Sequence, residues 1–287
     1  MQFIEILKII LLGVIEGVTE WLPISSTGHL MLVESIPNFP LNGVSEHFLG
    51  MFEYVIQLAA ILAVVILFWD KLFPLAKEER EGKLVWKTQS LTLWGKVLVA
   101  CIPAALALGV DIFFKNLPQA LETLIIALAL IIYGVLFILV EKHNKQPPKI
   151  IEATDISYKY AFFIGCFQIL AAIPGTSRSG ITIIGALVLG VSRMAAAEFT
   201  FFLAIPTMVG ASAYKLLAFF MESGGFSGPE LGYLLIGSAV AFTLSLASIK
   251  FLMDFVKKHD FKIFGWYRIL LGILVLCTLV LPPLLLR

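Results

Sequence analysis

Residues 23–29 read Pro-Ile-Ser-Ser-Thr-Gly-His, and residues 174–180 read Pro-Gly-Thr-Ser-Arg-Ser-Gly. Both polar strings interrupt long apolar stretches in a chain of 287 residues that is 59% hydrophobic. Polar side chains and broken helices are costly at membrane depth, because no water is present there to satisfy the exposed polar groups. Such strings are typical of a cavity that serves chemistry or transport, and they direct the search for a functional site.

The composition indicates a membrane protein without a separate soluble domain. Only 14% of the residues are charged, whereas a soluble protein carries about a quarter. Several apolar runs approach or exceed the roughly 20 residues that a helix needs to cross a bilayer. The net charge of +1 gives no electrostatic indication of nucleic acid as a partner. Three cysteines lie in apolar segments without metal-ligand spacing and are interpreted as packing residues: Cys101, Cys166 and Cys277.

Hydropathy predicts an all-α polytopic membrane protein with six transmembrane helices and two re-entrant helical hairpins. The six spans are expected at 48–69, 93–113, 119–140, 196–218, 230–252 and 265–286. The hairpins are expected over 3–36 and 158–192, each turning at its polar string. Such a turn at membrane depth requires protein or water around it.

The distribution of lysine and arginine predicts the orientation, since loops rich in these residues stay in the cytoplasm. The segments 70–92, 141–159 and 250–262 hold several of these cations each, whereas 34–47 and 219–229 hold none. The first group is therefore expected inside and the second outside, with both termini external. The hairpin over 3–36 then enters from outside, and the one over 158–192 enters from inside.

The two halves of the chain resemble each other. Residues 12–16 align with 164–168, and Pro-x-Ser-Ser at 23–26 aligns with Pro-x-Thr-Ser at 174–177 after a one-residue slip, which puts Thr27 opposite Arg178. This pattern predicts a single membrane domain, 1–287, built of two inverted repeats at about 1–141 and 157–287. An odd number of spans in each half inverts the second half, as in many transporters. The alternative is chance, because apolar sequences match one another easily.

Two carboxylates precede the first string. Glu16 and Glu20 are four residues apart, so they share one helix face one turn apart. In an apolar segment such a pair needs a proton, a basic partner or a cation, and oxygen ligands fit Mg²⁺ or Ca²⁺. The alternative is that both carboxylates are solvated at the membrane interface.

The first string has the composition of a helix start. Ser25, Ser26, Thr27 and Gly28 would surround free backbone amides, which attract anions and phosphate above all. His29 lies three residues after Ser26, so a base could activate a hydroxyl nucleophile there. The alternatives are that the serines only cap the helix and that His29 is an interfacial histidine with satisfied hydrogen bonds.

The second string adds a fixed cation at a similar helix start. Arg178 offers a planar fork of donors suited to phosphate oxygens, with Thr176, Ser177 and Ser179 beside it. The alternative is a structural salt bridge from Arg178 to one of the glutamates. Elsewhere, Glu53 is a candidate additional carboxylate, with solvation as the alternative.

Residues 16–29 and 174–180 resemble the two signature motifs of the bacitracin resistance family of undecaprenyl-diphosphate phosphatases. The resemblance implies a bacterial plasma-membrane enzyme that uses a divalent cation, faces outward and removes one phosphate from a C55 lipid carrier of peptidoglycan synthesis. Positions matching the family's active site are Glu16, Glu20, Ser26, His29 and Arg178. Positions matching motif residues that would contact the diphosphate are Thr27, Thr176, Ser177 and Ser179.

The sequence therefore predicts a lipid diphosphate phosphatase that acts on a polyprenyl diphosphate among membrane lipids. Ser26 is the expected nucleophile, with His29 as base. In two variants of this mechanism, the attacking group is His29 or water. The alternative function is a secondary transporter or flippase of a polyprenyl phosphate lipid, which the inverted repeat favours. The oligomeric state stays open, with a homodimer among the candidates.

Overall fold

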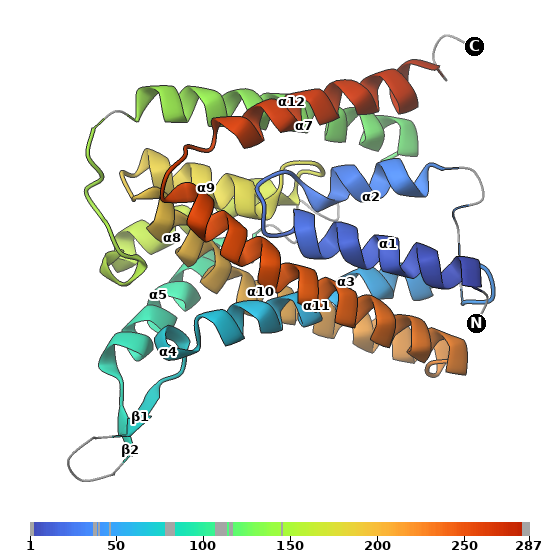
Figure 1. Ribbon diagram of the computed structural model, residues 1–287, viewed down its shortest axis with the longest axis horizontal. Coiled ribbons are helices and arrows are strands. Elements are labelled where there is room, and N and C mark those ends of the chain that lie inside the picture. The colour runs from blue at the N-terminus through green and yellow to red at the C-terminus, as the bar shows by residue number, and fades with distance from the viewer. Residues whose placement is uncertain are drawn as a thin grey trace.

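The computed structural model describes residues 3–36, 39, 41–45, 47–77, 84–106, 114, 117–144 and 146–282. The described chain is almost entirely helical (Figure 1), so the predicted all-α class is confirmed. Its α-helices are α1 (Phe3–Thr19), α2 (Ser26–Glu34), α3 (Phe48–Leu67), α4 (Trp69–Leu72), α5 (Thr88–Ala104), α7 (Gln119–His143), α8 (Tyr158–Gln168), α9 (Arg178–Val188), α10 (Arg193–Ser223), α11 (Gly228–Val256) and α12 (Lys262–Val275). Shorter helical turns are η1 (Ala153–Asp155), η2 (Ile169–Ala172) and the π-turn η3 (Leu276–Val280).

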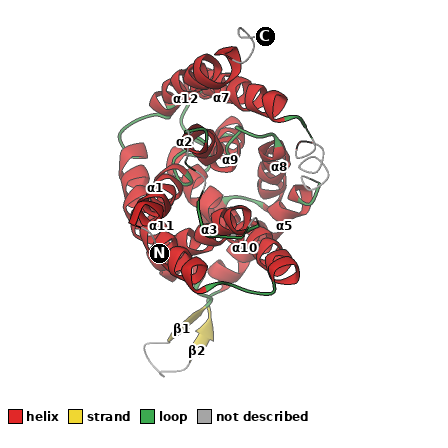
Figure 2. Ribbon diagram, turned by 90° about the vertical axis from the view of Figure 1, so that its right-hand side faces the viewer, coloured by secondary structure: helices red, strands yellow, loops and turns green. Residues whose placement is uncertain are grey.

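A short antiparallel hairpin follows α4. Its strands are β1 (Leu75–Lys77) and β2 (Leu84–Trp86), with Leu75 opposite Trp86. The hairpin projects away from the helical body, as Figure 2 shows. It forms no layer with the helices and therefore takes no part in positioning the polar strings.

Five helices of the described chain are long and apolar enough to cross a membrane: α3, α7, α10, α11 and the continuous helix Lys262–Val280. They correspond to five of the six predicted spans and begin within three residues of the predicted positions. The sixth predicted span, 93–113, corresponds to α5, whose 17 residues end at Ala104. Residues 107–113 lie outside the described chain, so this span is not confirmed.

Both predicted helix breaks occur at the polar strings. α1 ends at Thr19 and α2 begins at Ser26, and the two helices lie side by side after the chain has turned back (Figure 1). In the second stretch, η2 ends at Ala172 and α9 begins at Arg178. A proline lies in each gap, where its fixed φ and missing amide hydrogen disfavour a continuous helix.

The two breaks share an unusual backbone geometry. The residue before α2 is Ser25 with φ 74°, and the residue before α9 is Ser177 with φ 68°. They are the two described non-glycine residues with positive φ, a conformation that L-residues rarely adopt. Matching the halves at these serines places Arg178 opposite Ser26, one residue before the position that the motif alignment gives.

Glycines allow closely similar helix contacts in the two halves. A Cβ on Gly13 of α1 would lie 2.8 Å from the carbonyl oxygen of Gly237 in α11, and one on Gly165 of α8 would overlap the carbonyl oxygen of Ala100 in α5. Close backbone approach at small residues is a common way for helices to associate in lipid. α1 thus packs on α11 as α8 packs on α5.

The contact between α7 and α12 is reciprocal. A Cβ on Gly134 would lie 2.7 Å from the carbonyl oxygen of Gly265, and a Cβ on Gly265 would lie 2.7 Å from that of Gly134. The two helices run side by side along one edge of the molecule in both Figure 1 and Figure 2. They cover the tips of both broken stretches.

Ion pairs connect α10 to neighbouring elements. Glu198 accepts a hydrogen bond from Lys71 at 2.7 Å. Arg193 donates to both carboxylate oxygens of Glu141, with its Nη2 2.6 Å from Oε2. Arg193 is the first residue of α10 and extends to the end of α7, where Glu141 is buried.

Candidate active site

Glu20 joins the two polar strings. Its Oε1 accepts a hydrogen bond from Nη2 of Arg178 at 2.6 Å, and its Oε2 accepts one from the hydroxyl of Ser26 at 2.8 Å. The hydroxyl of Ser179 donates to the backbone carbonyl of Glu20 at 3.1 Å. Residues separated by more than 150 positions in the chain therefore meet around one carboxylate, as the paired motifs predict.

Arg178 is held by more than its ion pair. Nη1 donates to the hydroxyl of Thr207 at 3.2 Å, and Nη2 also contacts the sulfur of Met208. The salt bridge to a glutamate, proposed from sequence as the alternative to phosphate binding, is present. It does not exclude the other role, because a guanidinium has five donors and can hold a carboxylate and an anionic ligand together.

The histidine of the first string has hydrogen-bond partners other than Ser26. His29 Nδ1 is 2.7 Å from the backbone carbonyl of Ser25, and Nε2 is 2.7 Å from the hydroxyl of Tyr267. Since a carbonyl only accepts, Nδ1 carries the hydrogen, and in the neutral ring Nε2 accepts from Tyr267. The expected Ser26–His29 pair is therefore replaced by a Ser26–Glu20 pair, and Glu20 occupies the position of a base.

The rest of the first string forms an open helix start. Ser25 is buried, and its hydroxyl oxygen has no hydrogen-bond partner among the described residues. Among the described residues, α2 has no side-chain cap hydrogen bond at Ser25. Thr27 is exposed, whereas Gly28 is buried where a Cβ would lie 3.0 Å from Leu130. The first amides of α2 are therefore not bonded to a capping side chain, as an anion site requires.

The second string forms more side-chain hydrogen bonds at its helix start. The hydroxyl of Ser177 accepts from the amide of Gly180 at 3.2 Å and shares a hydrogen bond with the hydroxyl of Ser179. Thr176 is fully buried, and its hydroxyl has no partner among the described residues. Ser177 thus caps α9. The first backbone amides of α9 therefore have a side-chain acceptor at the cap position, which those of α2 lack at Ser25.

Glu16 is the most isolated of the predicted site residues. Its carboxylate is fully buried, and neither oxygen has a hydrogen-bond partner of normal geometry among the described residues. Glu20, Glu53 and Arg178 lie close enough to act on it electrostatically. The side chain of Gln57 also interacts with it. A buried carboxylate without a hydrogen bond of normal geometry is a costly group, and its oxygens fit a hard divalent cation.

The described residues nevertheless contain no group of three or more His, Cys, Asp or Glu side chains arranged around a metal position. A cation near Glu16 would therefore have few protein ligands. Such a site is typical of Mg²⁺, which keeps several waters and is often completed by substrate phosphates.

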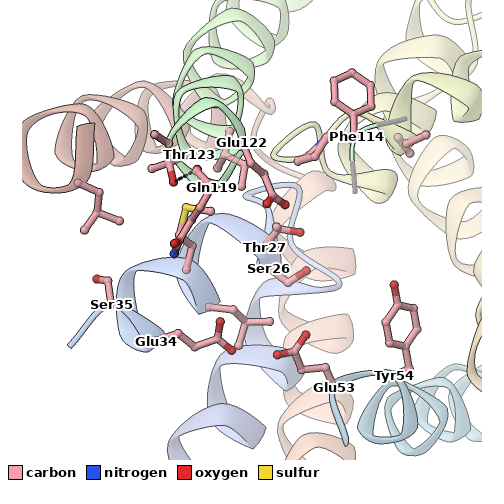
Figure 3. A pocket seen from close by; sticks show the side chains of 18 of the residues that line it. Ser26, Thr27, Glu34, Ser35, Glu53, Tyr54, Phe114, Gln119, Glu122 and Thr123 are labelled. Carbon is pink, nitrogen blue, oxygen red and sulfur yellow. Dashed lines mark hydrogen bonds between the residues drawn. The ribbon is translucent and has the colours of Figure 1, made fainter. Parts of the chain in front are cut away.

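A cavity of about 800 Å³ opens beside this cluster. Ser26 and Thr27 line it together with Glu34, Glu53 and Glu122, and Figure 3 shows these side chains around one space. Glu53 thus lies at the same cavity as Ser26, as the sequence suggested for an additional carboxylate. Because these carboxylates would repel a bare anion, an anionic ligand would bind in this cavity together with a cation.

Comparison with known proteins shows the family of the chain. Residues 9–274 match the family model described as bacitracin resistance protein BacA. The chain belongs to the BacA family. An undecaprenyl-diphosphatase of Enterococcus faecalis is 56% identical over 278 residues, which cover 96% of this chain and 98% of that protein. Those of Lachnoclostridium phytofermentans and Latilactobacillus sakei are 54% and 49% identical, again over 96% of this chain and 97% and 98% of theirs.

The BacA match includes both polar strings and also residues that the sequence analysis missed. Tyr267 contacts His29, and Thr182 donates to the backbone carbonyl of Arg178 at 2.9 Å. Thr182 in turn accepts a hydrogen bond from Thr200. Tyr267 lies at the start of a predicted apolar span, where an aromatic residue looks like an ordinary interface anchor. Its role depends on how α12 packs.

Proposed function

We propose that this chain hydrolyses undecaprenyl diphosphate to undecaprenyl phosphate and inorganic phosphate. The reaction would recycle the lipid carrier of peptidoglycan synthesis and confer bacitracin resistance. The observation that carries the proposal is the contact of Ser26 and Arg178 with the same carboxylate, Glu20. The relatives, each named undecaprenyl-diphosphatase, support the same reaction.

Ser26 and Glu20 suggest the chemistry. The hydroxyl oxygen of Ser26 would form a bond to the terminal phosphorus while its proton passes to Glu20, 2.8 Å away. The bond from that phosphorus to the bridging oxygen would break, and undecaprenyl phosphate would leave with the electron pair. Glu20 would pass that proton to the phosphate of the leaving lipid. Water would then attack the phosphoserine while Glu20 takes a proton from it. The bond from phosphorus to the Ser26 oxygen would break with its electron pair on that oxygen, Glu20 would return the proton to Ser26, and inorganic phosphate would leave.

Arg178 and the start of α2 would stabilise charge on the transferring group. The guanidinium fork and the uncapped amides of α2 can both donate to the equatorial phosphoryl oxygens. His29 as nucleophile is less favoured, because both of its nitrogens are engaged. A divalent cation held by Glu16 and Glu20 would supply Lewis-acid stabilisation of the diphosphate charge.

The metal requirement gives a first prediction. Chelation should abolish phosphate release from undecaprenyl diphosphate by the purified protein in detergent, and Mg²⁺ or Ca²⁺ should restore it. Glu16→Gln should raise the metal concentration needed for half-maximal activity by about tenfold or more, since one charged ligand is lost.

Metal-dependent thermal stabilisation gives a readout independent of turnover. Glu152→Gln, an exposed carboxylate outside the site, is the control. Full activity of Glu16→Gln at limiting metal would remove this carboxylate from the site.

The same proposal includes an architecture. Six spans and two re-entrant hairpins would form two inverted halves, 1–141 and 157–287, in the bacterial plasma membrane with the site facing outward. The matched glycine contacts and the paired positive-φ serines support related halves. The lysine distribution supports the orientation. The phosphatase is favoured over a transporter or flippase, because a carrier needs no hydroxyl held by a carboxylate.

Thiol labelling tests the orientation. Glu222 and Asp254 lie at opposite ends of the α10–α11 pair, and their side chains are 54% and 75% exposed. In a cysteine-free background, Glu222→Cys should react with an impermeant maleimide in intact cells, and Asp254→Cys only after permeabilisation. The reverse pattern would contradict an external site. Reaction of both from one side would contradict α11 as a span.

A further inference from the structure

Arg268 on α12 connects the two helix breaks. Its side chain is 0% exposed. Nη1 donates to the backbone carbonyl of Pro23 at 3.3 Å, and Nη2 donates to those of Gly175 and Thr176 at 2.8 and 2.9 Å. One planar group therefore bonds the backbone of both polar strings, one with each terminal nitrogen.

These carbonyls belong to residues that shortly precede Ser26 and Arg178 in the chain. Pro23 is three residues before Ser26, and Thr176 is two residues before Arg178. Ser26 reaches Glu20 within the first break, whereas the contacts of Arg178 and Ser179 with Glu20 cross the gap between the two strings. A shift of either string relative to the other would therefore change the distances on which those contacts depend.

We propose that Arg268 is a positioning residue for phosphoryl transfer, holding the two strings in the register that brings Arg178 to the Ser26–Glu20 pair. The inference rests on the proposed phosphatase function. Arg268 acts through the backbone and touches no reacting atom.

The surroundings of Arg268 favour this role over a role in stability alone. No carboxylate pairs with it among the described residues, and its Nε has no hydrogen-bond partner there. A buried cation without a counter-charge is costly, and an apolar residue of similar volume often serves stability better. The ring of Tyr133, 6.0 Å from the guanidinium carbon, offers a cation–π contact.

The neighbouring backbone leaves room for the guanidinium. A Cβ on Gly180, in the first turn of α9, would lie 3.3 Å from Nη1 of Arg268. The preceding residue, Tyr267, bonds His29 in the first string. Two adjacent residues of α12 thus contact the site.

Arg268→Lys tests the proposal, because an ammonium keeps the charge but cannot bond two diverging partners as the fork does. Phosphate release should show kcat lowered by about 100-fold with KM changed by less than about threefold, as expected for misplaced reacting groups. The control is Arg193→Lys, whose arginine bonds Glu141 away from the site. It should lose a similar amount of thermal stability and keep its kcat.

Two further measurements separate positioning from stability. Guanidinium at millimolar concentration should restore part of the kcat of Arg268→Ala and none of that of Arg178→Lys. In the double variant Arg268→Lys/Arg178→Lys, the losses in kcat should not multiply, since one residue acts through the placement of the other. Multiplying losses, wild-type kcat in Arg268→Lys, or failure of both Arg268 variants to fold would overturn the proposal. Absence of phosphate release by the wild-type protein would instead overturn the proposed function.

Discussion

Ser26→Ala should lower the turnover of undecaprenyl diphosphate by on the order of a thousandfold or more, with little change in substrate binding. The physical reason is that the substitution removes the attacking oxygen, which lies 2.8 Å from Glu20, and leaves the amides of α2 and the fork of Arg178 in place. Single-turnover phosphate release and equilibrium binding of the lipid to purified protein would measure the two quantities separately.

Ser35 provides a matched control for this variant. It follows α2, lines the same cavity and bonds the backbone carbonyl of Leu32 at 2.7 Å. Ser35→Ala should keep turnover within about threefold of wild type, as a substitution outside the reacting cluster should. A loss of less than about tenfold in Ser26→Ala, about 1.4 kcal/mol, is too small for a nucleophile. If His29→Ala were then inactive, Ser26 would be a helix-start ligand, and His29 or water would attack.

Arg178→Lys should lower turnover by at least about 100-fold although the charge is kept. The arginine reaches Glu20 with one nitrogen and Thr207 with the other, so its fork has a fixed direction in the site. An ammonium cannot hold Glu20 and bind a phosphoryl oxygen in the same geometry. Steady-state phosphate release, together with the thermal midpoint of each purified protein, would measure the effect.

Arg193→Lys is again the appropriate control, because that arginine also pairs with a carboxylate but lies outside the site. Comparable thermal midpoints and a selective loss of turnover in Arg178→Lys would support a role in the reaction. Turnover within about threefold of wild type would make Arg178 a structural ion-pair partner of Glu20, since an exchange without functional effect leaves no fork-dependent contact.

The elements that follow from local rules could be predicted from sequence. Apolar length predicts the five membrane-spanning helices, and a proline followed by small polar residues predicts the two breaks. The meeting of Glu20 with Arg178 follows from the two matching motifs, because a carboxylate and a guanidinium in apolar surroundings need partners.

Partner choice among several candidates could not be predicted in this way. Spacing allows His29 to face Ser26, yet His29 bonds Tyr267, a residue 238 positions away. Arg193 pairs with Glu141 at the end of α7, 52 positions away in the chain. Arg268 lies four residues into a predicted span, and its burial depends on α12 covering both strings. These outcomes depend on tertiary packing, which one sequence does not display.

The positive φ angles of Ser25 and Ser177 have a consequence for engineering. Each costs of the order of 1–3 kcal/mol, and glycine would relieve that cost without a steric penalty. A screen for heat-resistant variants would therefore be drawn to these two positions. At Ser177, glycine would remove the hydroxyl that caps α9, and at Ser25 it would loosen the start of the helix that carries Ser26. Thermostabilised forms selected in this way would be poor guides to the working enzyme, and both positions are best left unchanged in any library.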